Sequence, residues 1–191
     1  MASADELHFR KIPWCANLIN DPTWTPCNTS SRQAKGSTED SFFAETLKSD
    51  RTIRKLLSMH RKAVAEGSPA IQEVRMLVDL GNGVNGHPNI CHGGFVATML
   101  DEVIGVLLTL NLEIEQGRKR EESVNEPMRL FTAYLKVNYK KPVRTPGVVL
   151  CTAKFEKREG NKAWLVGAVE DGQGTVFATG EALFVEPRSK L

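Results

Sequence analysis

The spacing of apolar residues divides the chain near residue 67. Between Ser41 and Ala65 the pattern predicts an amphipathic helix, because five residues three and four positions apart form one mostly apolar face (Ile53, Leu56, Leu57, His60 and Val64). Residues 1–40 show no such period and are rich in Pro, Asn, Ser and Thr. We therefore expect residues 1–66 to form an extended arm, attached to the surface by Trp14 and Trp24, followed by that helix. Residues 67–191 are expected to form the main domain.

The pattern after Pro69 predicts one strand, one long helix and then four strands. The helix runs from Gly93 to about Asn111 and is apolar on nearly every side, which is typical of a buried helix. A charged loop follows at 113–127. The expected strands cover residues 71–80, 129–141, 148–157, 163–171 and 175–185, with glycine-containing turns at 159–161 and 171–174. This order predicts an α+β fold in which one antiparallel sheet wraps around one helix.

The first strand after the helix has alternating polarity. Four residues expected on one face (Ala133, Leu135, Val137 and Tyr139) alternate with four on the other (Thr132, Tyr134, Lys136 and Asn138). Such alternation predicts a half-buried antiparallel strand.

Composition narrows the class of protein. The 191 residues are 41% hydrophobic and 25% charged, as in a globular domain with a core, and the net charge of +2 is too small for nucleic-acid binding by bulk charge. Four cysteines without paired spacing favour a reducing compartment. We expect a cytoplasmic protein without a membrane span, and a mitochondrial location stays open if a transit segment precedes this chain.

Two glycines stand at the start of the apolar helix. Unpaired amides at Gly93 and Gly94, together with the helix dipole, form a suitable site for an oxyanion or a thioester carbonyl. The alternative is that the glycines only permit a tight turn from loop to helix. The residues alone leave both interpretations open.

Asp101 lies in the interior of this apolar helix. A buried carboxylate costs several kcal/mol unless it has a partner, so a functional role, such as general base, is one interpretation. The other is a polar stripe in which Asp101 and Glu102 both reach solvent. At the usual helical rise Asp101 lies about 12 Å beyond Gly93. If both act on one substrate carbonyl, two antiparallel copies of the helix must share the site across a two-fold axis, which implies a dimer.

Other catalytic classes have weaker support in the sequence. His87, Cys91 and His92 do not complete a known metal-ligand spacing, so no metal is expected. Cys91 as a nucleophile lacks an orienting partner beyond His92. The chain contains no Gly-x-Ser-x-Gly sequence that would indicate a serine hydrolase.

Three segments resemble one family. HGGFVATMLDEVIG (92–105) looks like the signature of hot-dog thioesterases of the PaaI-like type, and FTAYLKVNYKKPV (131–143) and PWCANLINDP (13–22) are similar to the thioesterase superfamily member 4 branch. The resemblance covers roughly residues 70–186. It implies a hot-dog fold, an acyl-CoA thioesterase without a cofactor beyond the coenzyme A of the substrate, and a homodimer or dimer of dimers. The alternative is a non-catalytic acyl-CoA-binding protein of the same fold.

The resemblance also implies roles for individual residues. Gly93 donates its amide to the thioester oxygen with Gly94 beside it, His92 shapes that loop, and Asp101 of the other subunit activates water or attacks directly. Thr132 positions the water, and Asn138 is expected on the same strand face. The phosphates of coenzyme A are expected near three cations, unless these are only solvated turn charges (Lys140, Arg158 and Lys162). The helix at 41–65 is expected either to cover the mouth of the acyl tunnel or to cover a sheet edge.

Overall fold

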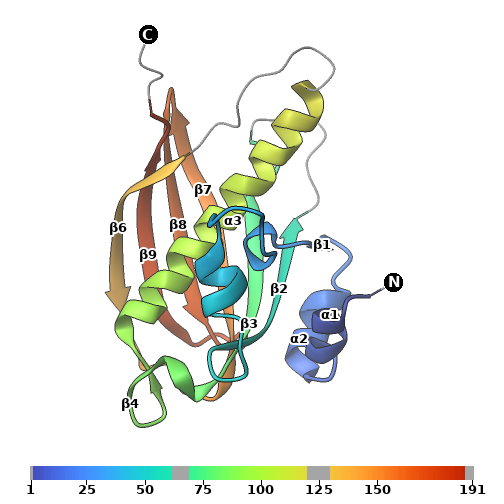
Figure 1. Ribbon diagram of the computed structural model, residues 1–191, viewed down its shortest axis with the longest axis vertical. Coiled ribbons are helices and arrows are strands. Elements are labelled where there is room, and N and C mark those ends of the chain that lie inside the picture. The colour runs from blue at the N-terminus through green and yellow to red at the C-terminus, as the bar shows by residue number, and fades with distance from the viewer. Residues whose placement is uncertain (1, 62–68, 120–129, 188–191) are drawn as a thin grey trace.

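A computed structural model describes residues 2–61, 69–119 and 130–187. One seven-stranded antiparallel sheet dominates it, with the strand order β1-β2-β3-β7-β8-β9-β6 (Figure 1). The strands are β1 (Trp24–Cys27), β2 (Ile53–Arg61), β3 (Glu73–Leu80), β6 (Phe131–Tyr139), β7 (Gly147–Glu159), β8 (Lys162–Glu170) and β9 (Val176–Val185). A small hairpin joins β4 (Asn85–His87) to β5 (Ile90–Cys91), and the helices are α1 (Ala4–Phe9), α2 (Pro13–Asn20) and α3 (Gly93–Lys119).

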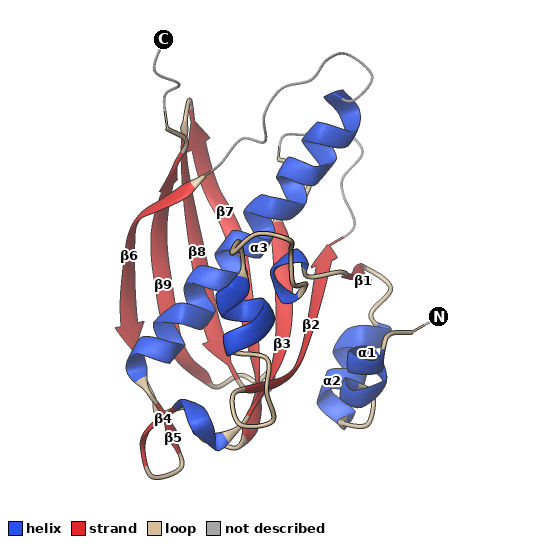
Figure 2. Ribbon diagram, viewed as in Figure 1, coloured by secondary structure: helices blue, strands red, loops and turns tan. Residues whose placement is uncertain are grey.

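The long helix α3 crosses the inner face of the sheet diagonally, and the sheet curves around it (Figure 2). Its sheet-facing side chains are buried and lie at spacings of three and four (Val96, Met99, Leu100, Val103, Ile104 and Leu107). This packing accounts for the apolar composition of Gly93–Glu115, a stretch that is long and apolar enough to cross a membrane by those two criteria. The predicted α+β plan is confirmed, with one sheet wrapped around one helix.

The outer face of the sheet carries a second, smaller core beneath α1 and α2. Phe9, Cys15 and Ile19 pack there against Leu57 and Leu77 of the sheet. Residues 1–40 are therefore not an extended arm, although the two tryptophans do attach them to the domain. Trp24 is buried in β1, and the ring of Trp14 packs against Gly172 in the turn between β8 and β9.

The amphipathic helix expected over Ser41–Ala65 is wrong where the structure describes it. Residues Phe42–Thr46 form one π-helical turn, Ile53–Arg61 form strand β2, and residues 62–68 lie outside the described residues. β2 pairs with β1 on one side and β3 on the other. Its inner face packs below α3 and its outer face below α1 and α2, so Leu56 and Leu57 are both buried. A strand buried on both faces does not alternate between apolar and polar residues, so the spacing of its apolar residues can resemble that of a helix.

The remaining expected elements are confirmed with small changes in length. β3 and β6–β9 fall within the predicted strand ranges to within two residues at each described end. Gly160, Gly172 and Gly174 have positive φ angles in the two turns that join β7 to β8 and β8 to β9. The helix is longer than expected, because Glu113–Lys119 continue it and are not a loop; residues 120–129 lie outside the described part of the chain.

Candidate functional site

Local hydrogen bonds fix the backbone at the start of α3. The carbonyl of His92 accepts from the amides of Phe95 (2.9 Å) and Val96 (3.1 Å), which starts the helix. The Gly94 amide donates to His92 Nδ1 at 3.0 Å, so the histidine caps the helix with its ring. The Gly93 amide has no acceptor among the residues that the structure describes. Of the two candidate donors, Gly93 is therefore the one with an unused N–H.

Asp101 lies on the side of α3 that faces β6. Its Oδ1 accepts a hydrogen bond of 2.9 Å from Thr132 Oγ1, and the carboxylate is half-buried. Neither sequence interpretation holds without change, because Asp101 is neither sealed in the core nor a fully exposed surface residue. The structure places the expected carboxylate and the expected strand hydroxyl in direct contact within one chain.

A β-bulge makes this contact geometrically possible. Thr132 pairs with Phe184 and Tyr134 pairs with Leu183, so Ala133 is an extra residue in β6. Because of it, Thr132 points toward α3 together with Leu135 and Tyr139, whereas strict alternation had placed Thr132 on the opposite face. Asn138 pairs with Thr179 and points away from α3. The expectation that Asn138 and Thr132 share a strand face is wrong.

Sequence reasoning missed Tyr139 as a member of the site. Its phenol hydroxyl donates to the carbonyl of Gly93 at 2.9 Å, across 46 residues of sequence. The side chain is 54% exposed in the single chain. Alternation along the strand placed Tyr139 on one of two faces and carried no sign of the contact, because its partner lies on another element.

Glu102 is a second carboxylate that sequence reasoning did not separate from Asp101. It points to a different side of α3, where Ser31 donates a hydrogen bond to its Oε1. Burial raises the pKa of Glu102 to about 7, against the opposing effect of the Ser31 hydrogen bond. The carboxyl lines a cavity of about 170 Å³ between α3 and residues 28–40.

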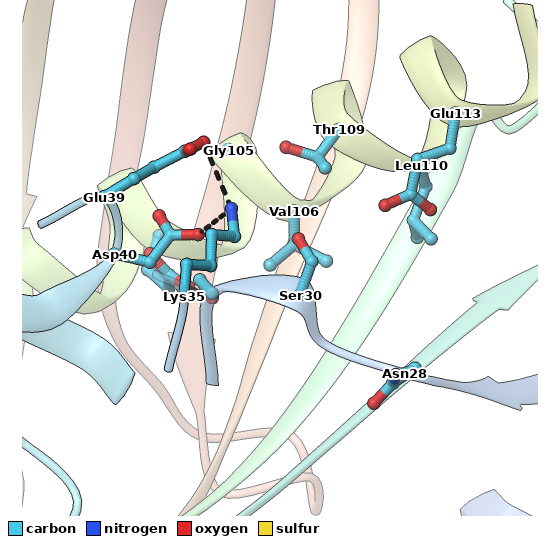
Figure 3. Close-up of a pocket in the computed structure, with 12 residues that line it drawn as sticks. Asn28, Ser30, Lys35, Glu39, Asp40, Gly105, Val106, Thr109, Leu110 and Glu113 are labelled. Carbon is cyan, nitrogen blue, oxygen red and sulfur yellow. Dashed lines mark hydrogen bonds and ion pairs between the residues drawn. The ribbon is translucent and has the colours of Figure 1, made fainter. Parts of the chain in front are cut away.

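The lining of this cavity is polar (Figure 3). Lys35 lies there between Glu39 and Asp40, at 3.1 Å and 2.6 Å from their carboxylate oxygens, and Glu113 lines the wall on α3. Charged walls of this kind are a poor environment for an aliphatic chain. The cavity therefore does not correspond to an acyl tunnel.

The alternative catalytic groups have unfavourable surroundings. Cys91 is buried, and burial raises the pKa of its thiol to about 12, so almost none of it is the thiolate that a nucleophile requires. In the described ranges, no three His, Cys, Asp or Glu side chains are grouped to hold a metal ion.

The three expected phosphate contacts do not gather in one chain. Arg158 and Lys162 lie together at the turn between β7 and β8, and Arg158 pairs with Glu115 of α3 at 3.4 Å. Lys162 is opposite Val185 at one end of β9, whereas the Lys140 amide bonds to Phe177 near the other end. These ends are about 26 Å apart at the usual strand rise.

Comparison with known proteins places the chain in a family. The model of the thioesterase superfamily matches residues 88–178. Verlamelin biosynthesis protein B of Lecanicillium is 30% identical over 181 residues, which cover 82% of this chain and 78% of that protein. The chain belongs to the thioesterase superfamily. The expected enzyme class, a thioester hydrolase, is thereby confirmed.

A further relative agrees over a shorter length. Mouse acyl-coenzyme A thioesterase THEM4 is 26% identical over 104 residues, 54% of this chain. The chain spans 38% of that protein, and 55% of an uncharacterised Schizosaccharomyces pombe protein that is 31% identical over 110 residues.

Solved structures confirm the hot-dog fold. The BH2602 protein from Bacillus halodurans, determined with CoA, has a TM-score of 0.51 and 17% identity, and the match covers 100% of this chain and 98% of that one. A hypothetical thioesterase protein from Streptococcus pneumoniae, determined with coenzyme A, has a TM-score of 0.50 and 13% identity, and the match covers 62% of this chain and 85% of that one. At these identities the likeness is one of fold.

Proposed function

We propose that this protein hydrolyses an acyl-CoA to the free acid and coenzyme A, without a metal or a further cofactor. The observation that carries the proposal is the Thr132–Asp101 hydrogen bond, which orients a half-buried carboxylate on the long helix. The amide of Gly93, which has no acceptor within the described ranges, supplies the second requirement, a donor for the thioester oxygen. Superfamily membership and the mouse relative agree with this substrate class.

In the proposed reaction Asp101 is the general base or the nucleophile. As a base, the carboxylate takes a proton from water while the resulting hydroxide attacks the thioester carbon. The Gly93 amide stabilises the negative charge that develops on the carbonyl oxygen. The carbon–sulfur bond then breaks, and the thiolate of coenzyme A receives the proton. Thr132 engages Oδ1 of Asp101, which leaves Oδ2 for the water.

The site is proposed to form between two copies of the chain. Gly93 and Asp101 lie eight residues apart on α3, or about 12 Å, which is too far for one carbonyl to contact both. β6 ends the sheet, and among the described residues three of the five large exposed apolar side chains belong to it (Phe131, Tyr134 and Tyr139). Such an edge is suited to pairing with a second copy.

The described contacts favour one register for this pairing. Tyr139 at one end of β6 bonds to Gly93, and Thr132 at the other end bonds to Asp101. Suppose that β6 pairs antiparallel with its copy across a two-fold axis at Lys136. Leu135 then lies opposite Val137 of the partner subunit. The bulge at Ala133 then lets Thr132 oppose Tyr139 of the partner subunit. This arrangement brings Asp101 of one copy toward Gly93 of the other.

A panel of acyl-CoA esters of increasing chain length tests the proposal, with released coenzyme A measured by its thiol. We expect turnover of at least one ester, and we expect Asp101→Asn to reduce kcat at least roughly a hundredfold without loss of the fold. Wild-type protein that binds the esters without turnover would instead support a non-catalytic acyl-CoA-binding protein. Wild-type activity in a folded Asp101→Asn variant would remove Asp101 from the reaction.

A further inference from the structure

The peptide unit between Gly93 and Gly94 is held at both of its polar ends. Its carbonyl accepts from the Tyr139 hydroxyl at 2.9 Å, and its amide donates to His92 Nδ1 at 3.0 Å. The preceding peptide unit is held through its carbonyl by the amides of Phe95 and Val96. These contacts leave one polar group of the two peptide units without a partner, the N–H of Gly93.

Two consecutive glycines need such restraints more than other residues do. Glycine has the widest range of backbone conformations, so the peptide units on either side of Gly93 lose more freedom than others when their directions are fixed. A donor stabilises a transition state best when its direction is set before the charge develops. The helix and His92 supply two restraints from the same segment, and the third comes from β6.

We propose that Tyr139 is a positioning residue, whose hydroxyl fixes the backbone at Gly93 so that the free amide of that residue points toward the thioester oxygen. This inference rests on the proposed function and goes beyond it. Tyr139 itself does not contact the reacting atoms. Its effect is transmitted through the carbonyl of Gly93.

The surroundings of Tyr139 favour this role over simple packing. The side chain is 54% exposed in the single chain, so the ring contributes little to its core. A Cβ atom added at Gly93 would lie 3.6–3.7 Å from the ring, so the ring flanks Gly93 at ordinary contact distance. The next residue is anchored, because the amide of Lys140 donates to Phe177 at 2.8 Å. The tyrosine therefore projects from a fixed strand end onto the start of the helix.

The chain offers a matched control, because Tyr134 and Tyr139 are its two tyrosines. Both lie on β6 and both are about half exposed, at 48% and 54%, but Tyr134 points to the outer face of the sheet. Tyr139→Phe and Tyr134→Phe each remove one hydroxyl and keep the ring. The acyl-CoA ester that the wild type hydrolyses fastest serves as substrate, and kcat and KM are measured separately.

For Tyr139→Phe we expect kcat to fall on the order of tenfold while KM stays within about twofold, because a lost restraint weakens transition-state binding more than substrate binding. Relaxation of ¹⁵N-glycine amides should report increased motion of Gly93 and Gly94 in the ligand-free variant. Tyr134→Phe should match the wild type in all three measurements. Tyr139→Leu removes the ring and the hydroxyl, and its kcat should fall at least as far as that of Tyr139→Phe. This variant is measured in place of Tyr139→Phe if the latter is poorly soluble.

Three results would overturn the inference. The first is an unchanged kcat in folded Tyr139→Phe, and the second is an equal loss in Tyr134→Phe. The third is a Tyr139→Phe variant that melts at a lower temperature but has the normal kcat per folded molecule. If the wild type hydrolyses no acyl-CoA ester, the proposed function fails instead, and the glycine relaxation data still report whether the hydroxyl restrains Gly93.

Discussion

Thr132 and Asp101 share a hydrogen bond of 2.9 Å although they are separated by 31 residues and lie on a strand and a helix. The bond depends on the extra residue Ala133, which turns the threonine toward α3. A carboxylate that accepts from a hydroxyl on one oxygen keeps a defined orientation for the other. The relationship links the geometry of the sheet edge to the chemistry of the helix.

Removing only the hydroxyl of Thr132 should lower activity through this link. Thr132→Val keeps the branched shape and loses the donor, and we expect kcat to fall roughly tenfold, the usual scale for a lost orienting hydrogen bond. Thr132→Ser retains the hydroxyl and should keep most of the activity. Steady-state kinetics on the three proteins checks this, and equal activity of the Val and Ser variants would contradict it.

The shared site can be tested by complementation between two inactive variants. Gly93 is the first residue of α3, where proline is tolerated because the N–H is not needed for the helix. Gly93→Pro should therefore remove the amide donor and leave α3 intact. Gly93→Ala is the control, since it keeps the N–H and its Cβ fits against Tyr139.

We expect mixing and refolding of Gly93→Pro with Asp101→Asn to restore activity in mixed dimers, in which one of the two sites has both groups. Neither variant should be active alone. Sedimentation or light scattering during turnover provides the second check. Full activity of a verified monomer would exclude a site shared between subunits.

Glu102 should make stability depend on pH. Its pKa is about 7 in the folded protein, against an ordinary value of 4.5, so between these two pH values the native state holds a proton that the unfolded chain has released. The contribution is favourable below pH 4.5 and is lost as pH rises through 7, by about 1 to 3 kcal/mol. Glu102→Gln should thus be more stable than the wild type at pH 8 and similar at pH 4.

Urea unfolding at several pH values measures this difference. Glu39→Gln is the matched control, because Glu39 lines the same cavity but its side chain is 62% exposed. This variant should leave the pH dependence of stability close to that of the wild type. Parallel curves for wild type and Glu102→Gln would contradict the assignment. Kinetics of Glu102→Gln adds a separate result, since loss of turnover there would make Glu102 a rival to Asp101 as the base.

The cysteines should be unreactive in the folded protein. Burial raises the pKa of Cys15, Cys27 and Cys91 to about 12 and also raises that of Cys151, so at pH 8 about one thiol in ten thousand is ionised. Iodoacetamide should not inactivate the native enzyme, and mass spectrometry should find modified cysteines only after unfolding. Rapid inactivation with labelling of Cys91 would restore it as a candidate nucleophile.

Periodicity was sufficient to predict the elements with one clear buried side. α3 and β7–β9 fall into this group, and so did the position of Asp101 on the helix. β3 is buried on both faces and β6 is largely exposed in the single chain, yet both were predicted as strands. β2 was misread because both of its faces are buried and its apolar residues happen to lie three and four positions apart. The short helix α1 has one local signal in the sequence, the pair Ser3 and Glu6, in which the Ser3 hydroxyl accepts from the Glu6 amide at 3.1 Å.

The site was predictable as residue types and not as contacts. His92, Gly93, Asp101 and Thr132 stand in a recognisable order along the chain. The bulge at Ala133 depends on how β6 pairs with β9, and a single strand does not encode that pairing. The Tyr139–Gly93 bond likewise joins a strand to a helix start, so one-dimensional spacing carried no sign of it.

The helices α1 and α2 restrict how larger assemblies can be built. They occupy the outer face of the sheet above Leu57, Met59, Leu77 and Leu150. Two dimers that stacked sheet against sheet would meet these helices on that half of the face. Such stacking can use only the opposite half of the outer face, where Tyr134, Leu183 and Trp164 form a row across β6, β9 and β8. In a tetramer built by such stacking, the N-terminal helices would therefore hold the two sheets apart on one half and leave the other half for the contact.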